Sequence, residues 1–356
     1  MRRAPFIVGL AAVLLTALSV AAAPLTPEQA LNRQEIAGAS GADAGLAVSP
    51  DGNQAAFVVV AAPEGKGRAQ NIWLFDRRSG NAFALTHGSH VNHAPRWSPD
   101  GRTLAFLSNR DDAPQIDLLP LGGGEARPLT RGDDGVRGFA WAPDGKSLAF
   151  LSPEPKPQIT PPGGKDDDAH VVDRDDRPDR LWTVDVASGE RRLVSPAGWA
   201  VDELQWLPSG DRLIVSATNQ PASDRDTNRI YSIAVSSGTF AELAAPHGPF
   251  GSLSLSPDAA TLAYLGARVD GPEPTDLYVL PLAGGAPRNL TGASLDRPVR
   301  QFVWQTDGSL LAIAAEGFTS DLDRIGLDGT VTKRPAEPVN PGSIGLLDEH
   351  TLATRQ

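Results

Sequence analysis

The side chains that could do chemistry in this sequence gather in three short stretches. In the first, His87, His90 and His93 stand three residues apart, and three imidazoles could bind Zn²⁺. That spacing brings side chains together on a helix, but the intervening Gly88 and the following Pro95 favour a loop. We therefore expect no metal ion at these histidines and keep a zinc site as the alternative.

Two acidic stretches could bind Ca²⁺. Asp224, Asp226 and Asn228 follow the spacing that opens an EF-hand loop, but Arg229 stands at the sixth position, where a sharp turn is needed, and no glutamate stands at the twelfth. The other stretch, 153–178, has prolines first and aspartates second, and its acidic run lacks the glycine and distal glutamate of a calcium loop. We expect a solvated insertion there. Its aspartates are Asp166, Asp167, Asp168, Asp173, Asp175 and Asp176.

The short motifs that mark catalytic or nucleotide-binding sites do not occur in the sequence. It contains no G-x-S-x-G, no H-E-x-x-H, no G-x-x-x-x-G-K-[ST] and no C-x-x-C. No strand–turn–helix pattern is present that could expose a nucleophilic serine. We therefore predict no catalytic residue, no cofactor and no metal ligand within these residues.

The composition limits the partners. The formal net charge of −11 opposes binding to phosphate backbones or anionic lipids, so we expect neither nucleic acid nor a membrane surface as a partner. The 36 glycines and 31 prolines indicate many turns, because hydrophobic runs lie between them. The absence of cysteine excludes disulfides, so the fold must depend on a large core.

The N-terminal residues have the pattern of a secretory signal peptide. Arg2 and Arg3 precede an uncharged run that ends in small residues, and we predict cleavage after Ala21 or Ala22. An uncleaved anchor is the alternative, since the run could nearly span a bilayer. The sequence thus predicts a signal peptide at 1–22 and an exported protein, periplasmic or secreted, with no other membrane segment.

A turn motif typified by Ser-Pro-Asp-Gly recurs along the chain. The steps between its copies are 49, 44, 65, 49 and 49 residues, and a period of this size with strand signals indicates a β-propeller. The first residues of the six turns are Ser49, Ser98, Ala142, Leu207, Ser256 and Gln305.

Each period contains four short strand patterns, which is the content of one propeller blade. The second strands, such as 104–107 and 148–151, are apolar on both faces, as expected for a blade packed between two neighbours. We predict an all-β propeller with six blades and a partial seventh over 41–356. The partial blade is the stretch "SIGLLDEHTLATRQ", in which the sequence stops within a second strand.

We interpret the recurring turn as a structural element and not as a ligand site. Proline fixes the second position, and glycine takes the left-handed position that closes a hairpin with a bulge. Ala259 replaces that glycine once, and one copy lacks the aspartate, which six equal binding loops would tolerate poorly. Just before the turn stand tryptophans that we expect to be core residues: Trp97, Trp141, Trp206 and Trp304.

Residues 24–40 are predicted to form a short helix and linker before the first blade. Thr26 is a suitable N-cap, Pro27 suits the first helical position, and Gln29 completes a capping box. Gly38 is a suitable stop. The apolar residues of this helix would cover the base of the propeller or contact a further domain.

The repeats "WSPDGRTLAFLSNRDD" and "SPDAATLAYLGARVDG", together with the opening "LTPEQALNRQEIAG", resemble the propeller of the prolyl oligopeptidase family of serine peptidases, in its acylaminoacyl-peptidase and dipeptidyl-aminopeptidase branches. The resemblance implies a non-catalytic propeller that limits entry of peptides to the active site of a C-terminal α/β-hydrolase domain. In that family the catalytic Ser, Asp and His lie in the hydrolase domain, so none is assigned to a residue here.

Under this resemblance the expected partners are peptides and a hydrolase domain, and the incomplete seventh blade is interpreted as a truncation: a fragment, a frameshifted gene or a decayed paralogue. The other hypothesis is a TolB-like propeller that stands alone and binds a protein partner, since such propellers share the turn motif. The separate N-terminal α/β domain of TolB-like proteins does not fit into the about 25 residues between the signal peptide and the first turn.

Overall fold

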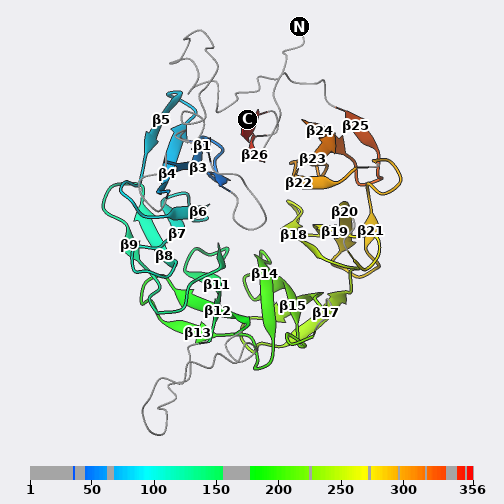
Figure 1. The fold of residues 1–356 in the computed structure, drawn as a ribbon, viewed down its shortest axis with the longest axis horizontal. Helices are drawn as coiled ribbons and strands as arrows, with labels where there is room; N and C mark the ends of the chain where they lie inside the picture. Colours follow the sequence, from blue (N-terminus) through cyan, green and yellow to red (C-terminus); the bar gives the residue numbers. More distant parts are fainter. Residues whose placement is uncertain are drawn as a thin grey trace.

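The computed structural model describes residues 35–36, 45–61, 68–154, 177–223, 227–271, 274–295, 297–316, 319–333, 343–348 and 351–355. These residues form strands and turns, with no helix among them. The sheets stand radially around a central axis (Figure 1). The predicted all-β propeller is confirmed.

Six blades each have four antiparallel strands, with the first strand nearest the axis and the fourth at the rim (Figure 1). Blades 1 to 3 are β2 (Leu46–Val48), β3 (Gln54–Val60), β4 (Gln70–Asp76) and β5 (Asn81–Ala84); β6 (Asn92–Trp97), β7 (Thr103–Ser108), β8 (Gln115–Pro120) and β9 (Arg127–Pro128); and β10 (Gly138–Trp141), β11 (Ser147–Pro153), β12 (Asp179–Asp185) and β13 (Arg191–Leu193). Blades 4 to 6 are β14 (Ala200–Trp206), β15 (Arg212–Thr218), β16 (Arg229–Ala234) and β17 (Phe240–Ala244); β18 (Phe250–Leu255), β19 (Thr261–Gly266), β20 (Asp276–Pro281) and β21 (Arg288–Asn289); and β22 (Val299–Trp304), β23 (Leu310–Glu316), β24 (Thr319–Ile325) and β25 (Val331–Lys333).

The seventh position of the ring holds a two-stranded sheet. β26 (Ser343–Asp348) pairs with β27 (Thr351–Arg355) in antiparallel register. β26 contacts β22 of blade 6 and β2 of blade 1, so this sheet lies between those blades, near the axis (Figure 1). The predicted partial seventh blade is therefore present as a first and a second strand.

The predicted helix at 24–40 is wrong where the structure describes it. Only two of its residues are described, and they form strand β1 (Glu35–Ile36), which pairs with Val59 and Val60 of β3. β2 reaches only the first half of β3, so the second half needs another partner for its backbone N–H and C=O groups, and β1 supplies it.

The predicted signal peptide and the rest of 24–40 lie outside the described residues. In the described part of the chain, no helix has the length and apolar character needed to cross a bilayer.

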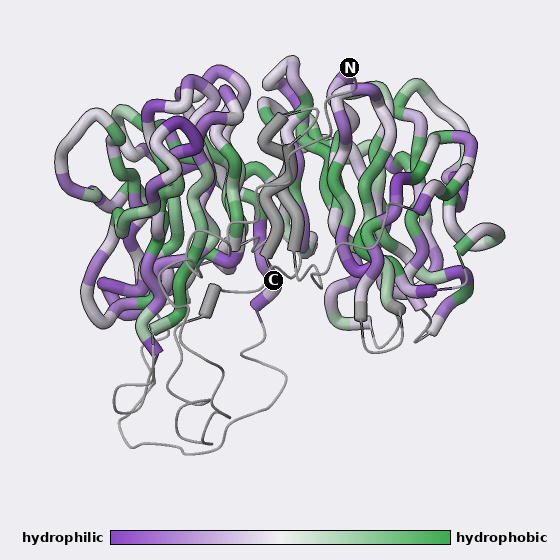
Figure 2. Tube along the Cα trace, turned by 90° about the horizontal axis from the view of Figure 1, so that it is seen from above, coloured by the Kyte–Doolittle hydropathy of each residue, from purple (hydrophilic) through white to green (hydrophobic). Residues whose placement is uncertain are grey.

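The cores lie between blades. Second strands are buried along nearly their whole length, as in β7 and β11, which confirms the two-sided apolar pattern. One cluster joins Leu118 of blade 2 to Phe139 and Phe150 of blade 3, and similar clusters join other neighbouring blades. Figure 2 shows hydrophobic residues along the strands and hydrophilic residues at both ends. Each blade is thus stabilised chiefly by burial against its two neighbours.

All six turns between first and second strands have the predicted form. In each, the fourth residue donates its N–H to the carbonyl of the first, as from Gly101 to Ser98 at 2.9 Å, and has a positive φ. Ala259 adopts the same conformation with a φ of 53°. Where serine opens the turn, its hydroxyl donates to the aspartate, as from Ser98 to Asp100 at 2.6 Å. The aspartates serve the turn itself, so the structural interpretation is confirmed.

The tryptophans before these turns do more than fill the core. Each donates its indole N–H to a backbone carbonyl in the first strand of the preceding blade, which links neighbouring inner strands directly. These bonds run from Trp97 to Ala47 (3.0 Å), Trp141 to Arg96 (3.2 Å), Trp206 to Ala140 (3.2 Å) and Trp304 to Ser254 (3.1 Å).

The junction between blades 4 and 5 has Leu255 in place of tryptophan and a different link. The carboxylate of Glu203 on β14 accepts hydrogen bonds from the backbone N–H groups of Ser252 (2.9 Å) and Leu253 (2.8 Å) on β18. Ser252 has a φ of 60° within an irregular stretch of β18, and this conformation turns both N–H groups toward the carboxylate.

Candidate binding face

The two ends of the propeller differ in their connections. The turn face is formed by the first-to-second strand turns, each five residues long: 49–53, 98–102, 142–146, 207–211, 256–260 and 305–309. The loop face, at the opposite end, contains the second-to-third strand connections, which range from two to 25 residues: 61–69, 109–114, 154–178, 219–228, 267–275 and 317–318. Binding functions concentrate on connections that can vary without disturbing the scaffold, so the loop face is the candidate functional surface.

A hydroxyl group anchors this face in four blades. It stands just after the fourth strand and accepts a hydrogen bond from a third-strand N–H that would otherwise lack a partner. The bonds run from Ile72 to Thr86 (2.8 Å), Ile116 to Thr130 (2.9 Å), Leu181 to Ser195 (3.0 Å) and Leu277 to Thr291 (3.0 Å).

The residue before that N–H is polar in each of these blades, but its chemical type differs. These four residues are Asn71, Gln115, Arg180 and Asp276. Gln115 donates to the carbonyls of Gly132 (3.0 Å) and Asp134 (3.1 Å), and so fixes the connection to the next blade. Arg180 donates to the Ser195 carbonyl at 2.6 Å and pairs with Glu154. The polar residue before the anchored N–H therefore fixes a different segment of the chain in each blade.

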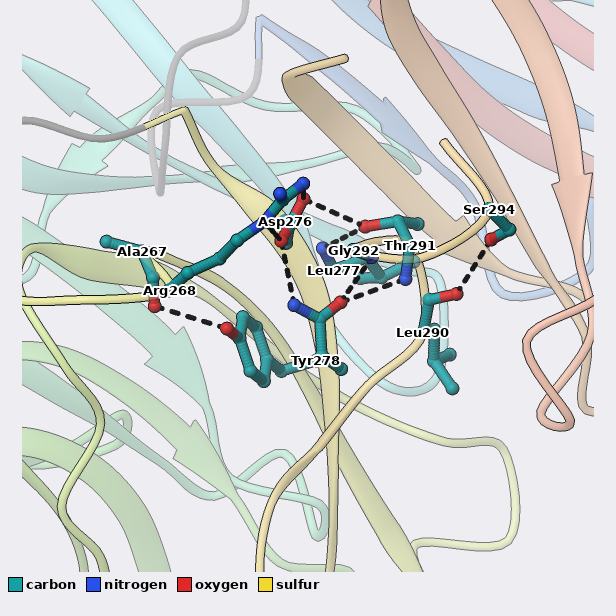
Figure 3. Close-up of polar contacts among 10 residues, drawn as sticks. Ala267, Arg268, Asp276, Leu277, Tyr278, Leu290, Thr291, Gly292 and Ser294 are labelled. Carbon is teal, nitrogen blue, oxygen red and sulfur yellow. Dashed lines mark hydrogen bonds and ion pairs between the residues drawn. The ribbon is translucent and has the colours of Figure 1, made fainter. Parts of the chain in front are cut away.

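Asp276 of blade 5 has the densest set of contacts (Figure 3). Its fully buried carboxylate accepts hydrogen bonds from Arg268 at 2.5 and 3.2 Å and from the Asn289 side chain at 2.7 Å. Asn289 in turn accepts from the backbone N–H groups of Thr291 (3.0 Å) and Gly292 (2.7 Å). The network ties the 267–275 connection to the end of the fourth strand, while the Arg268 side chain keeps 41% of its surface exposed.

Further ion pairs on the loop face have the same local role. Asp117 of β8, whose pKa burial raises, lies 3.3 Å from Arg110 of the neighbouring connection. Asp134 pairs with Arg177 at 2.6 Å. These carboxylates are held by guanidinium groups, and the arrangement fits the positioning of loops better than proton transfer or nucleophilic attack.

His247 and Asp270 form a histidine–carboxylate pair on this face, at 3.2 Å. Both side chains are mostly exposed, and Asp270 also accepts from the Gly248 N–H at 2.9 Å. Hydrogen bonding to that N–H holds the pKa of Asp270 below its ordinary value. Asp270 therefore joins the 267–275 connection to the segment at His247 and Gly248.

The structure describes the histidines of the alternative zinc site, but only parts of the two acidic stretches. Among the described residues, which include His87, His90 and His93, no group of three histidine or carboxylate side chains is arranged to hold a metal ion. The aspartates from Asp166 to Asp176 lie outside the described residues, as do Asp224 and Asp226. Asn228 is described, and it donates to Asp202 at 2.6 Å.

Inspection of the sequence did not identify the hydroxyl anchors or the polar residues before them. A signal was present, because Leu-Thr recurs at the ends of three repeats, at 85–86, 129–130 and 290–291. The partner of each threonine lies 14 residues earlier, so the pairing becomes clear only once the third and fourth strands are placed side by side.

Comparison with known proteins agrees with this architecture. Residues 28–160 match the family model described as the TolB beta propeller domain. Over 77 residues the chain is 42% identical to the uncharacterized peptidase YuxL of Bacillus subtilis (strain 168), a match that covers 21% of this chain and 12% of YuxL.

Two solved structures show the same fold. Acylaminoacyl peptidase of Pyrococcus horikoshii aligns with a TM-score of 0.64 and 17% identity, over 89% of this chain and 48% of that one. TolB from Acinetobacter baumannii aligns with a TM-score of 0.51 and 19% identity, over 80% of this chain and 60% of that one. The match thus spans less than two thirds of each of these three proteins. Residues 28–160 are thus similar in sequence to the TolB beta propeller domain, and the chain shares its β-propeller fold with the aligned parts of these two structures.

Proposed function

We propose that this propeller is the non-catalytic, access-limiting part of an exported peptidase, and that it acts beside an α/β-hydrolase domain that these 356 residues do not contain. The observation that carries the proposal is the 42% identity to the peptidase YuxL. The alignment with an acylaminoacyl peptidase over 89% of this chain supports it.

The shape of the ring and the connections on its loop face support a gating role. A ring of radial blades surrounds a central axis, and its loop face has connections of very different lengths, suited to contact with another domain. The Arg268–Asp276 and Arg177–Asp134 pairs fix the bases of these connections. A rigid ring with fixed loop bases can exclude large substrates by size, because it does not deform as they approach.

An activity series tests the proposal. The chain alone is expected not to hydrolyse aminoacyl or dipeptidyl chromogenic substrates. Among the described residues, no nucleophile lies beside a general base and oxyanion donors in the arrangement that such hydrolysis needs. The DNA after codon 356, read in three frames, is expected to encode G-x-S-x-G followed by Asp and then His. With that hydrolase present, cleavage should fall steeply with peptide length, and removal of the propeller should abolish the length limit.

Two results would refute the gating role. One is turnover by the purified chain alone that a serine-directed phosphonate blocks. The other is a hydrolase whose preference for short peptides is unchanged when the propeller is deleted.

A second candidate is a propeller that binds a protein partner, as a TolB-like module. The family model over residues 28–160 favours it. The chain fixed on a resin would then retain one partner from an extract of its own cells at stoichiometric amount, and the downstream DNA would encode no hydrolase.

Export is part of the proposal and rests on the N-terminal segment. Fractionation of the native cells should place the chain outside the cytoplasm. N-terminal sequencing should start at Ala22 or Ala23, and a chain that begins at Met1 would contradict cleavage.

A further inference from the structure

The five junctions from blade 1 to blade 6 do not share the same links. In four of them a tryptophan indole N–H bonds to the preceding inner strand, and in three of these an arginine of the fourth strand forms a second link at the rim. Each rim arginine donates to a carbonyl just after the third strand of the next blade. These bonds run from Arg127 to Val186 (3.2 Å), from Arg192 to Val235 (2.7 Å) and from Arg288 to Leu327.

The junction between blades 4 and 5 has residues that cannot form either of these links. Leu255 stands where the four other junctions have tryptophan. Ala241 stands at the position of the rim arginine, because it pairs with Ser232 of blade 4 as Arg192 pairs with Thr183 of blade 3. Neither leucine nor alanine has a side-chain donor, so the inner and the rim bonds are both lost at this one junction.

The side of blade 4 that packs on blade 5 is also more polar than its counterparts. Ser216 and Ser232 lie on this side, at 2% and 6% exposure, next to Ile214. Ile214 packs against Leu262 of blade 5. In blades 1, 2, 3 and 5 the position of Ser216 holds Val58, Leu107, Leu151 and Leu265, and that of Ser232 holds Leu74, Leu118, Thr183 and Val279. A buried hydroxyl stabilises a junction less than a buried aliphatic side chain, and the Ser232 hydroxyl accepts its bond from Arg212 of the same blade, at 2.6 Å.

Blades 4 and 5 are linked instead through the carboxylate of Glu203, which accepts from the N–H groups of Ser252 and Leu253. A carboxylate is strongly hydrated in water, and burial raises the pKa of Glu203 despite the two amide donors, so desolvation outweighs these bonds. When the blades part, water hydrates the carboxylate again and offsets much of the loss. A neutral indole regains less hydration, so the Glu203 link resists separation less than an indole link does.

We propose that the ring opens locally between blades 4 and 5, as a minor state in equilibrium with the closed ring, while the other four junctions from blade 1 to blade 6 stay closed. Regions with fewer links and less apolar burial open at a free energy below that of global unfolding. Such an opening lets an extended polypeptide reach the central axis from the side. As an entry route for peptides it rests on the proposed gating function, but as a motion of the ring it can be measured on the isolated chain.

Thiol labelling tests the proposal, because the sequence contains no cysteine and a single one can be introduced. Ser232→Cys places a thiol at the junction of blades 4 and 5, and Thr183→Cys places one at the matched position between blades 3 and 4. Both positions are buried, at 6% and 9% exposure. Under native conditions the Ser232→Cys thiol should react with an aromatic disulfide reagent about ten-fold or more faster than the Thr183→Cys thiol, and faster than global unfolding of the same variant in urea allows. Ser216→Cys serves if Ser232→Cys does not fold.

A second variant restores the rim donor. Ala241→Arg, added to Ser232→Cys, places a guanidinium where it can reach the carbonyl of Leu282, which follows the third strand of blade 5. This change should slow labelling by about three-fold or more, whereas Ala241→Met, which is similar in length but has no donor, should not. Equal labelling of Ser232→Cys and Thr183→Cys, or labelling no faster than global unfolding, would refute the opening. Equal effects of Ala241→Arg and Ala241→Met would refute the missing rim bond as its cause.

Discussion

The Glu203 carboxylate on β14 accepts a hydrogen bond from the Leu253 N–H on β18, 2.8 Å away and 50 residues later in the sequence. A second bond comes from the Ser252 N–H at 2.9 Å. The junction between blades 4 and 5 therefore depends on one acidic side chain, where four other junctions have an indole N–H.

Glu203→Ala should destabilise the propeller. Two backbone N–H groups would lose their acceptor, and we expect the free energy of unfolding to fall by about 2–3 kcal/mol. Urea unfolding followed by tryptophan fluorescence measures the change. Glu242→Gln, at an exposed position of β17, is the control and should have little effect. Equal losses in both variants would disprove the link.

Gly251→Ala probes the same junction sterically. A Cβ on Gly251 would lie 2.5 Å from the Glu203 carboxylate oxygen, so the carboxylate must move and its two hydrogen bonds weaken. In a double-mutant cycle, Gly251→Ala should cost clearly less in the Glu203→Ala background than in the wild type. Additive effects would contradict this coupling.

Titration of Glu203 should make stability depend on pH. Burial raises its pKa above the ordinary value, and the two amide donors offset this only in part. Between the ordinary and the raised pKa, the folded state retains a proton that the unfolded state has lost, so the free energy of unfolding falls as pH rises through that window. Glu203→Gln removes the effect, so the wild-type minus variant difference should slope downward with pH. A flat or rising difference would refute it.

Trp206→Phe tests the indole links. The Ala140 carbonyl would lose its donor while most of the ring packing is retained, and we expect a loss of about 1–2 kcal/mol. The control is Trp73→Phe, since Trp73 packs against Phe57 within its own blade. A control loss as large as that of Trp206→Phe would show that ring volume, and not the link, stabilises the junction.

Ala259→Gly should stabilise the protein, because alanine there adopts a left-handed φ of 53° that costs an L-residue about 1–2 kcal/mol. Gly101→Ala is the reciprocal change. The added Cβ would meet Pro50 at an ordinary 3.6 Å, so its cost comes from the backbone alone. Calorimetric midpoints should rise for the first variant and fall for the second. Shifts of the same sign would contradict the argument.

The ring was predictable from sequence because its signals are local. A Pro-Asp-Gly turn and an apolar strand are specified by adjacent residues, so the turns at Ser98 and Ser256 and the buried strands followed directly. β1 did not follow, since Glu35 and Ile36 become a strand only through the unpaired end of β3. The capping box at Thr26 describes a local preference that gives no information about that edge.

The candidate face was harder to predict because its contacts join residues that are distant in the sequence. Asp276 and Arg268 are eight residues apart, but Asn289 and Thr291 join them only after β21 is placed beside β20. The sequence around Glu203 gave no indication that this side chain accepts two backbone hydrogen bonds, because those bonds depend on an irregular strand in another blade. The sequence already indicated that His87, His90 and His93 do not share a helix, and in the structure His93 lies in β6 while the other two precede it.

The unequal lengths of the second-to-third strand connections have a consequence for how such a chain tolerates change. The entropy of closing a loop grows only with the logarithm of its length, so the 25-residue connection at 154–178 costs about 1.4 kcal/mol more to close than a five-residue one would. Insertions on this face are therefore thermodynamically cheap, whereas the first-to-second strand turns are five residues long in all six blades. New sequence can accumulate on the loop face while the ring stays unchanged, which makes that face the natural place to graft a foreign peptide.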